Sequence, residues 1–125
     1  MKRLYALRGA FQCMNTITDI CEQTAMMYDE LLNANRLKEG DIVSLIFSVT
    51  DDINAINPCT ALRKTGRAKD LALFSAREPE CGNSLERTVR AIIHCYLEEG
   101  AKPCHVYRNG AEVLRPDRSA NVKKS

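Results

Sequence analysis

The sequence predicts a single domain of the α+β class, in which short strands and one long helix share one core. Three observations lead to this prediction. The chain has 125 residues, the usual size of one domain. One long segment carries apolar residues at helical spacing, whereas several short segments are apolar and rich in β-branched or aromatic residues. With 45% hydrophobic and 27% charged residues, the composition is that of an ordinary globular protein.

The first two elements are expected to be a strand and the long helix. Residues 4–11 form a short apolar segment, which as a strand would place Arg8 and Ala10 on one face. From Thr16 to Leu32 the apolar residues recur at the spacing of an amphipathic helix. The Thr16 hydroxyl is well placed to cap the start of that helix.

The middle of the chain predicts two strands and a short helix. Residues 41–50 are β-branched and aromatic enough to form a buried strand. Pro58 can open a short helix that Gly66 ends. Residues 71–75 predict another strand, and a polar loop that carries Glu78 follows it.

Residues 85–97 satisfy the helical period as well as the strand period, so periodicity alone does not decide their structure. We favour a short helical turn near Ser84 that leads into a strand over residues 88–96. In that strand Arg90 and His94 would share a face.

Asn109-Gly110 is a strong hairpin signal between two further segments. A two-residue turn there would pair residues 104–108 with residues 111–115. The alternation of side chains would then place Tyr107 and Leu114 on the same face of the hairpin.

Composition argues against several classes of function. The net charge is only +2 and the basic residues are spread along the chain, unlike those of a dedicated nucleic-acid-binding protein. No apolar run approaches the roughly 20 residues of a membrane-spanning helix, and no signal peptide is recognisable. We therefore expect a cytoplasmic protein with one domain over residues 1–117 and a mobile tail over residues 118–125.

The inventory of catalytic groups is short. The six cysteines include no CxxC pair, so in a reducing compartment we expect free thiols rather than disulfides or metal ligands. There is no glycine-rich phosphate loop, no GxSxG and no HExxH motif, and there are only two histidines. Ordinary hydrolytic, nucleophilic or metal-dependent chemistry therefore lacks obvious residues.

Arginines at the ends of apolar segments remain as candidates for a functional site. Arg8, Arg63, Arg90 and Arg115 occupy such positions. Each one taken alone is best interpreted as a solvated or ion-paired side chain. Together they could converge on an anion with more than one carboxylate, which the bidentate guanidinium group suits better than an ammonium group.

A series of short motifs, in order along the chain, resembles a known family. The motifs are Arg8-Gly9-Ala10, residues 48–53, Pro58 with Arg63, Glu78, Arg90, Val106-Tyr107 and residues 113–117. Over about residues 3–118 the set resembles the small trimeric α/β class of chorismate mutases. No single motif is diagnostic, but the ordered set in a chain of the family's usual length is specific.

The resemblance implies a mixed five-stranded sheet packed on one long helix plus a short helix. It further implies a homotrimeric pseudo-α/β-barrel with active sites between subunits. The implied reaction is the rearrangement of chorismate to prephenate in the shikimate pathway of aromatic amino acid biosynthesis. This intramolecular reaction needs no cofactor, metal or nucleophile. Catalysis would come from holding the flexible dianion in its reactive conformation and stabilising the charge that grows on its ether oxygen.

The resemblance also implies roles for individual residues. Arg90 would contact the ether oxygen and a carboxylate, Arg8 would bind a carboxylate, and Glu78 would bind the ring hydroxyl, which makes these three the expected catalytic residues. Ser75 would share the hydroxyl, and Tyr107 would hydrogen-bond a carboxylate. The other expected substrate-binding residues are Asn57, Cys59, Thr60, Arg63, Leu73, Phe74, Ala76, Arg77, Leu114 and Arg115.

The chain departs from the family's usual residues along one wall of the implied site. Asn57 and Cys59 flank the proline where the family has Phe and Ala, and Thr60 stands in place of a lysine. Ser75 stands in place of a cysteine, which is a conservative change. A polar wall with one cation fewer predicts a higher KM with kcat less affected, unless Lys64 or Arg67 substitutes.

Two other functions remain open at this point. The first is a non-catalytic trimer that binds a different small dicarboxylate, although the presence of Arg8, Glu78 and Arg90 together counts against it. The second is an enamine or imine deaminase of a similarly assembled trimeric family. The ordered match through Tyr107 and Arg115 speaks against that function, and an assay for ammonia release would separate it from a mutase.

Overall fold

The computed structural model describes residues 1–82 and 85–114. Its elements are β1 (Lys2–Gln12), α1 (Ile17–Ala34), β2 (Ile42–Val49), α2 (Pro58–Lys64), β3 (Ala72–Arg77), β4 (Thr88–Glu98) and β5 (Val106–Arg108), with short 3-10 turns at Glu39–Asp41 and Ala111–Leu114. The predicted class is confirmed, because one five-stranded mixed sheet packs with one long and one short helix.

The sheet has the strand order β3-β2-β4-β1-β5. Its central strand β4 runs antiparallel to both neighbours, and its pairing with β1 extends from Lys2↔Glu98 to Gln12↔Thr88. The edge strands β3 and β5 run parallel to β2 and β1. Residues 88–96, which fitted both the helical and the strand period, therefore form part of a strand, as we expected.

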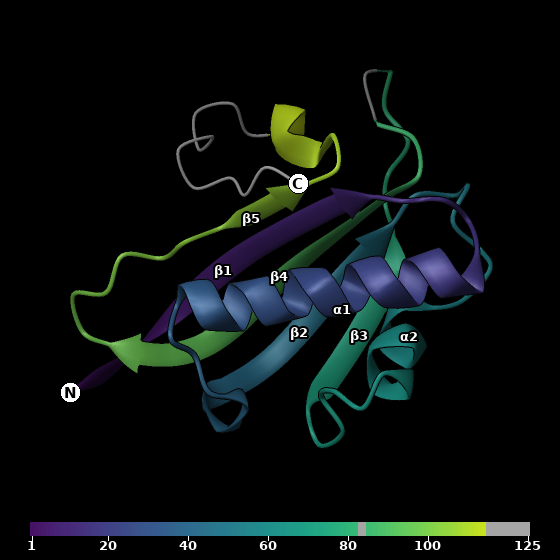
Figure 1. Ribbon diagram of the computed structural model, residues 1–125. Coiled ribbons are helices and arrows are strands. Elements are labelled where there is room, and N and C mark those ends of the chain that lie inside the picture. Colours follow the sequence, from purple (N-terminus) through teal and green to yellow (C-terminus); the bar gives the residue numbers. More distant parts are fainter. Residues whose placement is uncertain (83–84, 115–125) are drawn as a thin grey trace.

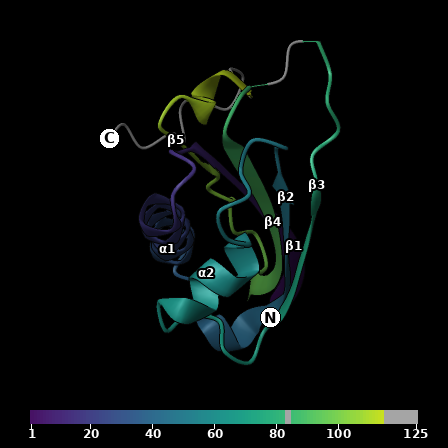
Figure 2. The ribbon, with the colours of Figure 1, turned by 90° about the vertical axis from the view of Figure 1, so that its right-hand side faces the viewer.

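Both helices cover the same face of the sheet. In Figure 1, α1 lies across the strands with α2 beside it, and the view in Figure 2 shows both helices on one side of the sheet. Neither α1 nor α2 covers the opposite face, which we call the open face. Leu4, Ile46, Phe74 and Tyr96 are exposed there, Phe74 to 65% of its surface.

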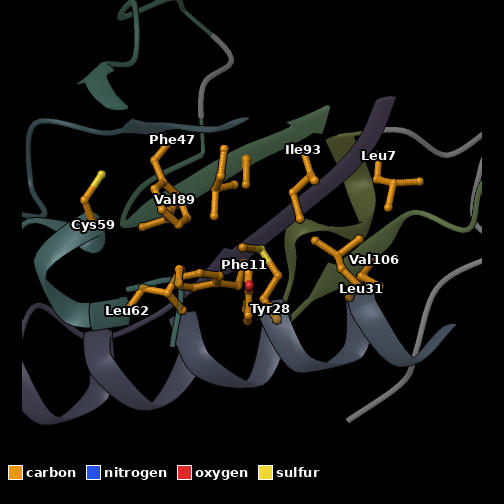
Figure 3. Close-up of a cluster of buried hydrophobic side chains, with 14 of the residues drawn as sticks. Leu7, Phe11, Tyr28, Leu31, Phe47, Cys59, Leu62, Val89, Ile93 and Val106 are labelled. Atoms are coloured by element: carbon orange, nitrogen blue, oxygen red, sulfur yellow. The ribbon is translucent and has the colours of Figure 1, made fainter. Parts of the chain in front are cut away.

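The core fills the space between the sheet and the helices. Figure 3 shows Phe47, Val89 and Ile93 of the strands facing Tyr28 and Leu31 of α1. Alternation along each strand sends every second side chain into this core and the next one to the open face. Buried and exposed residues alternate in this way along β4 and through the middle of β1.

Local sequence signals start and end the helices as predicted. Thr16 Oγ1 accepts a hydrogen bond from the Asp19 backbone amide at 3.1 Å and so caps α1. Pro58 lies in the first turn of α2, and Gly66 follows that helix with φ of +85°. A positive φ favours glycine at this position, where the chain turns toward β3.

The predicted hairpin between residues 104–108 and 111–115 is wrong. Asn109 and Gly110 do form a turn with positive φ, but β5 pairs with β1, and the next described residues form a 3-10 turn rather than a strand. The Asn109 side chain donates to Gln12 O at 3.4 Å and to Gln23 Oε1 at 2.7 Å. These contacts tie the turn to β1 and α1 and take the chain away from a hairpin.

None of the six cysteines forms a disulfide. Burial raises the pKa of the Cys13 thiol to about 12 and that of Cys95 to about 11. Within the described ranges no helix is long and apolar enough to span a membrane. The expected turn at Ser84, Arg115 and the expected tail lie outside the described residues.

Gly9 lets α1 approach β1 closely, because a Cβ at this position would come within 2.8 Å of Met27 Sδ and 2.9 Å of Leu31 Cδ1. We expect Gly9→Ala to lower the free energy of unfolding by about 1–3 kcal/mol through overpacking. Urea denaturation measures the change. Gly40→Ala is the control, since nothing lies within 4 Å of a Cβ there. Equal midpoints for the two variants would contradict the close approach.

Candidate active site

The open face contains a cavity of about 320 Å³ near one end of the sheet. The residues that give it chemical character are Arg8, Ser48, Glu78, Arg90, Tyr107 and Leu114. The structure thus brings together five residues of the predicted site, and it adds Ser48, for which the sequence patterns gave no role. In the sequence Ser48 opens the 48–53 motif and is a polar residue on the outward side of an apolar strand, but neither feature assigns it a task.

Strand pairing sets the positions of the two arginines. Arg90 of β4 lies opposite Ala10 of β1 and opposite Ser48 of β2. Arg8 precedes Ala10 by two residues, so alternation puts its side chain on the same face as Arg90. Both long cations therefore project from the open face, because the other face is filled by the core.

Among the described residues, Glu78 supplies the one carboxylate at this cavity. Its backbone amide donates to Val49 O at 2.8 Å, which extends the pairing of β3 with β2 by one residue. Its Oε1 accepts from Ser48 Oγ at 2.5 Å, and its Oε2 accepts from Arg90 Nη1 at 3.1 Å. Because only 16% of the Glu78 side chain is exposed, solvent screens this ion pair less than an ordinary surface pair.

The backbone of Arg8 is held by a histidine. The Arg8 amide donates to His105 Nδ1 at 2.9 Å, and His105 is buried beside β1. A ring nitrogen that accepts a hydrogen bond carries no proton, so this contact requires an unprotonated Nδ1. His105 precedes β5, and its ring extends by one position the edge contacts that β5 makes with β1.

Tyr107 and Leu114 are neighbours, as predicted, but through a helical turn instead of a hairpin. Leu114 packs against the small cluster that contains Tyr107 and Ala111. Tyr107 is 3% exposed, and its hydroxyl is buried with no hydrogen-bond partner among the described residues. Since an unsatisfied buried hydroxyl is unfavourable, its position at the cavity wall favours a ligand acceptor.

The other predicted site residues within the described ranges do not line this cavity. Asn57, Ser75, Ala76 and Arg77 line a separate cavity of about 340 Å³ at the β3 edge. There Asn57 Nδ2 donates to Ser75 Oγ at 2.8 Å. The residues that line neither cavity are Cys59, Thr60, Arg63, Leu73 and Phe74.

Arg67 does not replace the lysine that is missing at Thr60. Arg67 donates to both carboxylate oxygens of Asp29, at 2.8 Å and 2.7 Å, so its charge is already paired. Arg63 donates to Leu71 O at 3.3 Å.

The arrangement suits an anion that carries carboxylates and a hydroxyl. Two guanidinium groups can bind carboxylates, and Glu78 can accept a hydrogen bond from a hydroxyl. Within the described ranges, no group of three or more His, Cys, Asp or Glu residues is placed to hold a metal ion.

Residues 4–118 match the profile of the family described as chorismate mutase type I. The chain belongs to this family. Chorismate mutase AroH of Bacillus subtilis is 25% identical over 115 residues, 90% of this chain and 91% of that protein. Chorismate mutase AroH of Thermus thermophilus is 30% identical over 114 residues, 89% of this chain and 93% of that protein.

A solved chorismate mutase structure has the same fold. The structure of a chorismate mutase from Clostridium thermocellum matches with a TM-score of 0.82 and 38% sequence identity. The match covers 88% of this chain and 99% of that one. The resemblance inferred from the ordered motifs is therefore confirmed.

The unpartnered hydroxyl of Tyr107 predicts an unusual response to mutation. Tyr107→Phe removes a polar group that has no partner among the described residues, so the free energy of unfolding should stay the same or rise by up to about 1 kcal/mol. Tyr28→Phe is the control, because the Tyr28 hydroxyl donates to Glu39 Oε2 at 2.5 Å. Loss of the Tyr28 hydrogen bond should lower the free energy of unfolding by about 1–3 kcal/mol. Urea denaturation compares the two variants, and an equal loss in both would contradict the prediction.

Proposed function

We propose that the chain is an active chorismate mutase that rearranges chorismate to prephenate without a cofactor. The family supports this activity, and one observation carries it to this chain: Arg8, Glu78 and Arg90 surround a single cavity. The family match also favours a mutase over the enamine or imine deaminase.

The physical task of such an enzyme is electrostatic and conformational. As the C–O bond of the substrate breaks, negative charge grows on the ether oxygen. A guanidinium group already in place stabilises that charge with little reorganisation. Arg90 projects into the cavity and is the residue we assign to the ether oxygen and a carboxylate.

The other residues of the cavity would hold the dianion in its reactive shape. Arg8 would bind a carboxylate, and the unpartnered Tyr107 hydroxyl would donate to one. Glu78 would accept a hydrogen bond from the ring hydroxyl. Leu114 would supply an apolar wall. Fixing the two reacting ends of one flexible molecule lowers the entropic part of the barrier.

We further propose that the active unit is a homotrimer with sites between subunits. Two observations support it. The open face carries large exposed apolar side chains, such as Phe74, which a second copy could cover. The predicted site residues also fall into two sets, one around the Arg90 cavity and one near α2 and β3. The second set would reach the cavity of a neighbouring subunit.

That second set would form the polar wall of the site. It comprises Asn57, Cys59, Thr60, Arg63, Leu73, Phe74, Ser75, Ala76 and Arg77. Arg67 is paired with Asp29, so it does not replace the lysine that the family has at the position of Thr60. We therefore still expect a raised KM for chorismate. A cytoplasmic location also belongs to this proposal, since cysteines that form no disulfide suit a reducing compartment.

The decisive variant is Arg90→Ala. Loss of one preorganised charge should raise the barrier by about 3 kcal/mol or more, so kcat should fall more than about 100-fold. The assay follows the loss of chorismate absorbance without added metal, with prephenate identified as the product. Arg3→Ala is the control, because Arg3 lies on β1 away from the cavity, beside the Tyr5 ring.

Equal slow decay of chorismate with the wild-type protein and with Arg90→Ala would reject the enzyme and favour the binding protein. Ammonia release from an enamine or imine substrate would instead favour the deaminase. Full activity in Arg3→Ala, with activity lost in Arg90→Ala, is the result that we expect.

A further inference from the structure

We propose that Ser48 is a positioning residue of the active site, which holds Glu78 so that most of the Arg90 guanidinium group remains available to the substrate. This inference rests on the proposed function. It assigns a task to a residue for which neither the strand pattern nor the motifs gave a role.

The geometry separates the two oxygens of Glu78. Ser48 Oγ donates to Oε1 at 2.5 Å, and Arg90 Nη1 donates to Oε2 at 3.1 Å. Each oxygen therefore has its own partner among the described residues. Ser48 also lines the cavity itself.

The register of the sheet creates this contact. Ser48 of β2 lies opposite Arg90 on one side and opposite Ala76 of β3 on the other. Glu78 follows Ala76 by two residues, and its amide still pairs with Val49 O. Alternation places all three polar side chains on the open face. The contact thus depends on the pairing of three strands and not on a flexible loop alone.

The hydrogen bond from Ser48 to Glu78 limits how Glu78 can pair with Arg90. A carboxylate beside an arginine favours a bidentate pair with two parallel N–H···O bonds. Such a pair would occupy more of the Arg90 N–H groups and counter its charge more strongly. By holding Oε1, Ser48 limits the contact to a single hydrogen bond from Arg90. The remaining guanidinium N–H groups can then serve the developing negative charge of the substrate.

The first test is Ser48→Ala. We expect kcat/KM to fall about tenfold, comparable to the loss of one hydrogen bond to a charged group, mainly through kcat because Arg90 acts on the transition state. Ser48→Thr keeps the hydroxyl and should restore most of the activity. Ser44→Ala is the matched control on the same strand and face, where Ser44 Oγ lies 3.2 Å from His94 Nδ1. It should change kcat/KM less than about twofold.

A double-mutant cycle separates positioning from a general structural effect. In a Glu78→Ala background, Ser48→Ala should cause no further loss of kcat/KM, because the carboxylate that Ser48 holds is absent. An equal tenfold loss in that background would overturn the proposal, as would a Ser48→Ala enzyme with wild-type kcat. Sedimentation of each variant checks that the assembly is unchanged.

A spectroscopic measurement tests the contact independently of activity. The carboxyl carbon-13 resonance of Glu78, assigned by its absence in Glu78→Ala, should move in Ser48→Ala and stay in place in Ser44→Ala. An unmoved resonance would overturn the proposal. If the wild-type protein turned over no chorismate, the proposed function would fail, and this resonance would still decide whether Ser48 holds Glu78.

Discussion

The alternation of side chains along β1 and β4 is the constraint on which the rest of the structure depends. These central strands pair over their whole lengths, and the helices cover one face of the sheet. Leu7 and Ile93 are fully buried in the core, so their neighbours Arg8 and Ile92 must face the other way. The core and the site are consequently two sides of the same strand pairing.

The open face concentrates charge that the overall composition does not show. The chain carries a net charge of only +2, yet two arginines line one cavity together with Glu78, the one carboxylate there among the described residues. Glu78 pairs with Arg90 and offers an acceptor for a hydroxyl. Local placement, rather than net charge, therefore determines which ligand the cavity suits.

Much of the fold could be predicted because its signals are local. The period along α1, its Thr16 cap and the apolar runs of β2 and β3 all follow from neighbouring residues. The predicted hairpin was wrong because the pairing of its first strand depends on residues that are far apart in the sequence. Its Asn109-Gly110 turn is a local signal, whereas the pairing of β5 with β1 depends on residues almost a hundred positions apart.

The site also combines residues that sequence motifs predict with a residue whose role depends on strand pairing. Arg8, Glu78, Arg90 and Tyr107 could be predicted because they lie in ordered motifs of the family. Ser48 could not be given a role, because a serine on an outward strand position has no distinctive pattern. Its task depends on the register of three strands, which only the structure provides.

The central claim is that the open face completes its site with residues from a second copy of the chain. Mixed trimers test it directly. Arg90→Ala removes the catalytic charge, and Ser75→Asp adds a negative charge that should repel the dianion, so each variant alone should be nearly inactive. Random co-assembly of equal amounts pairs an intact Arg90 with an intact Ser75 at about one quarter of the interfaces.

Chorismate turnover by the co-expressed mixture is therefore the measurement to make. The account predicts about a quarter of the wild-type activity per site, from two variants that are nearly inactive when separate. Activity no higher than the mean of the separate variants, in trimers shown to contain both chains, would contradict a site shared between subunits.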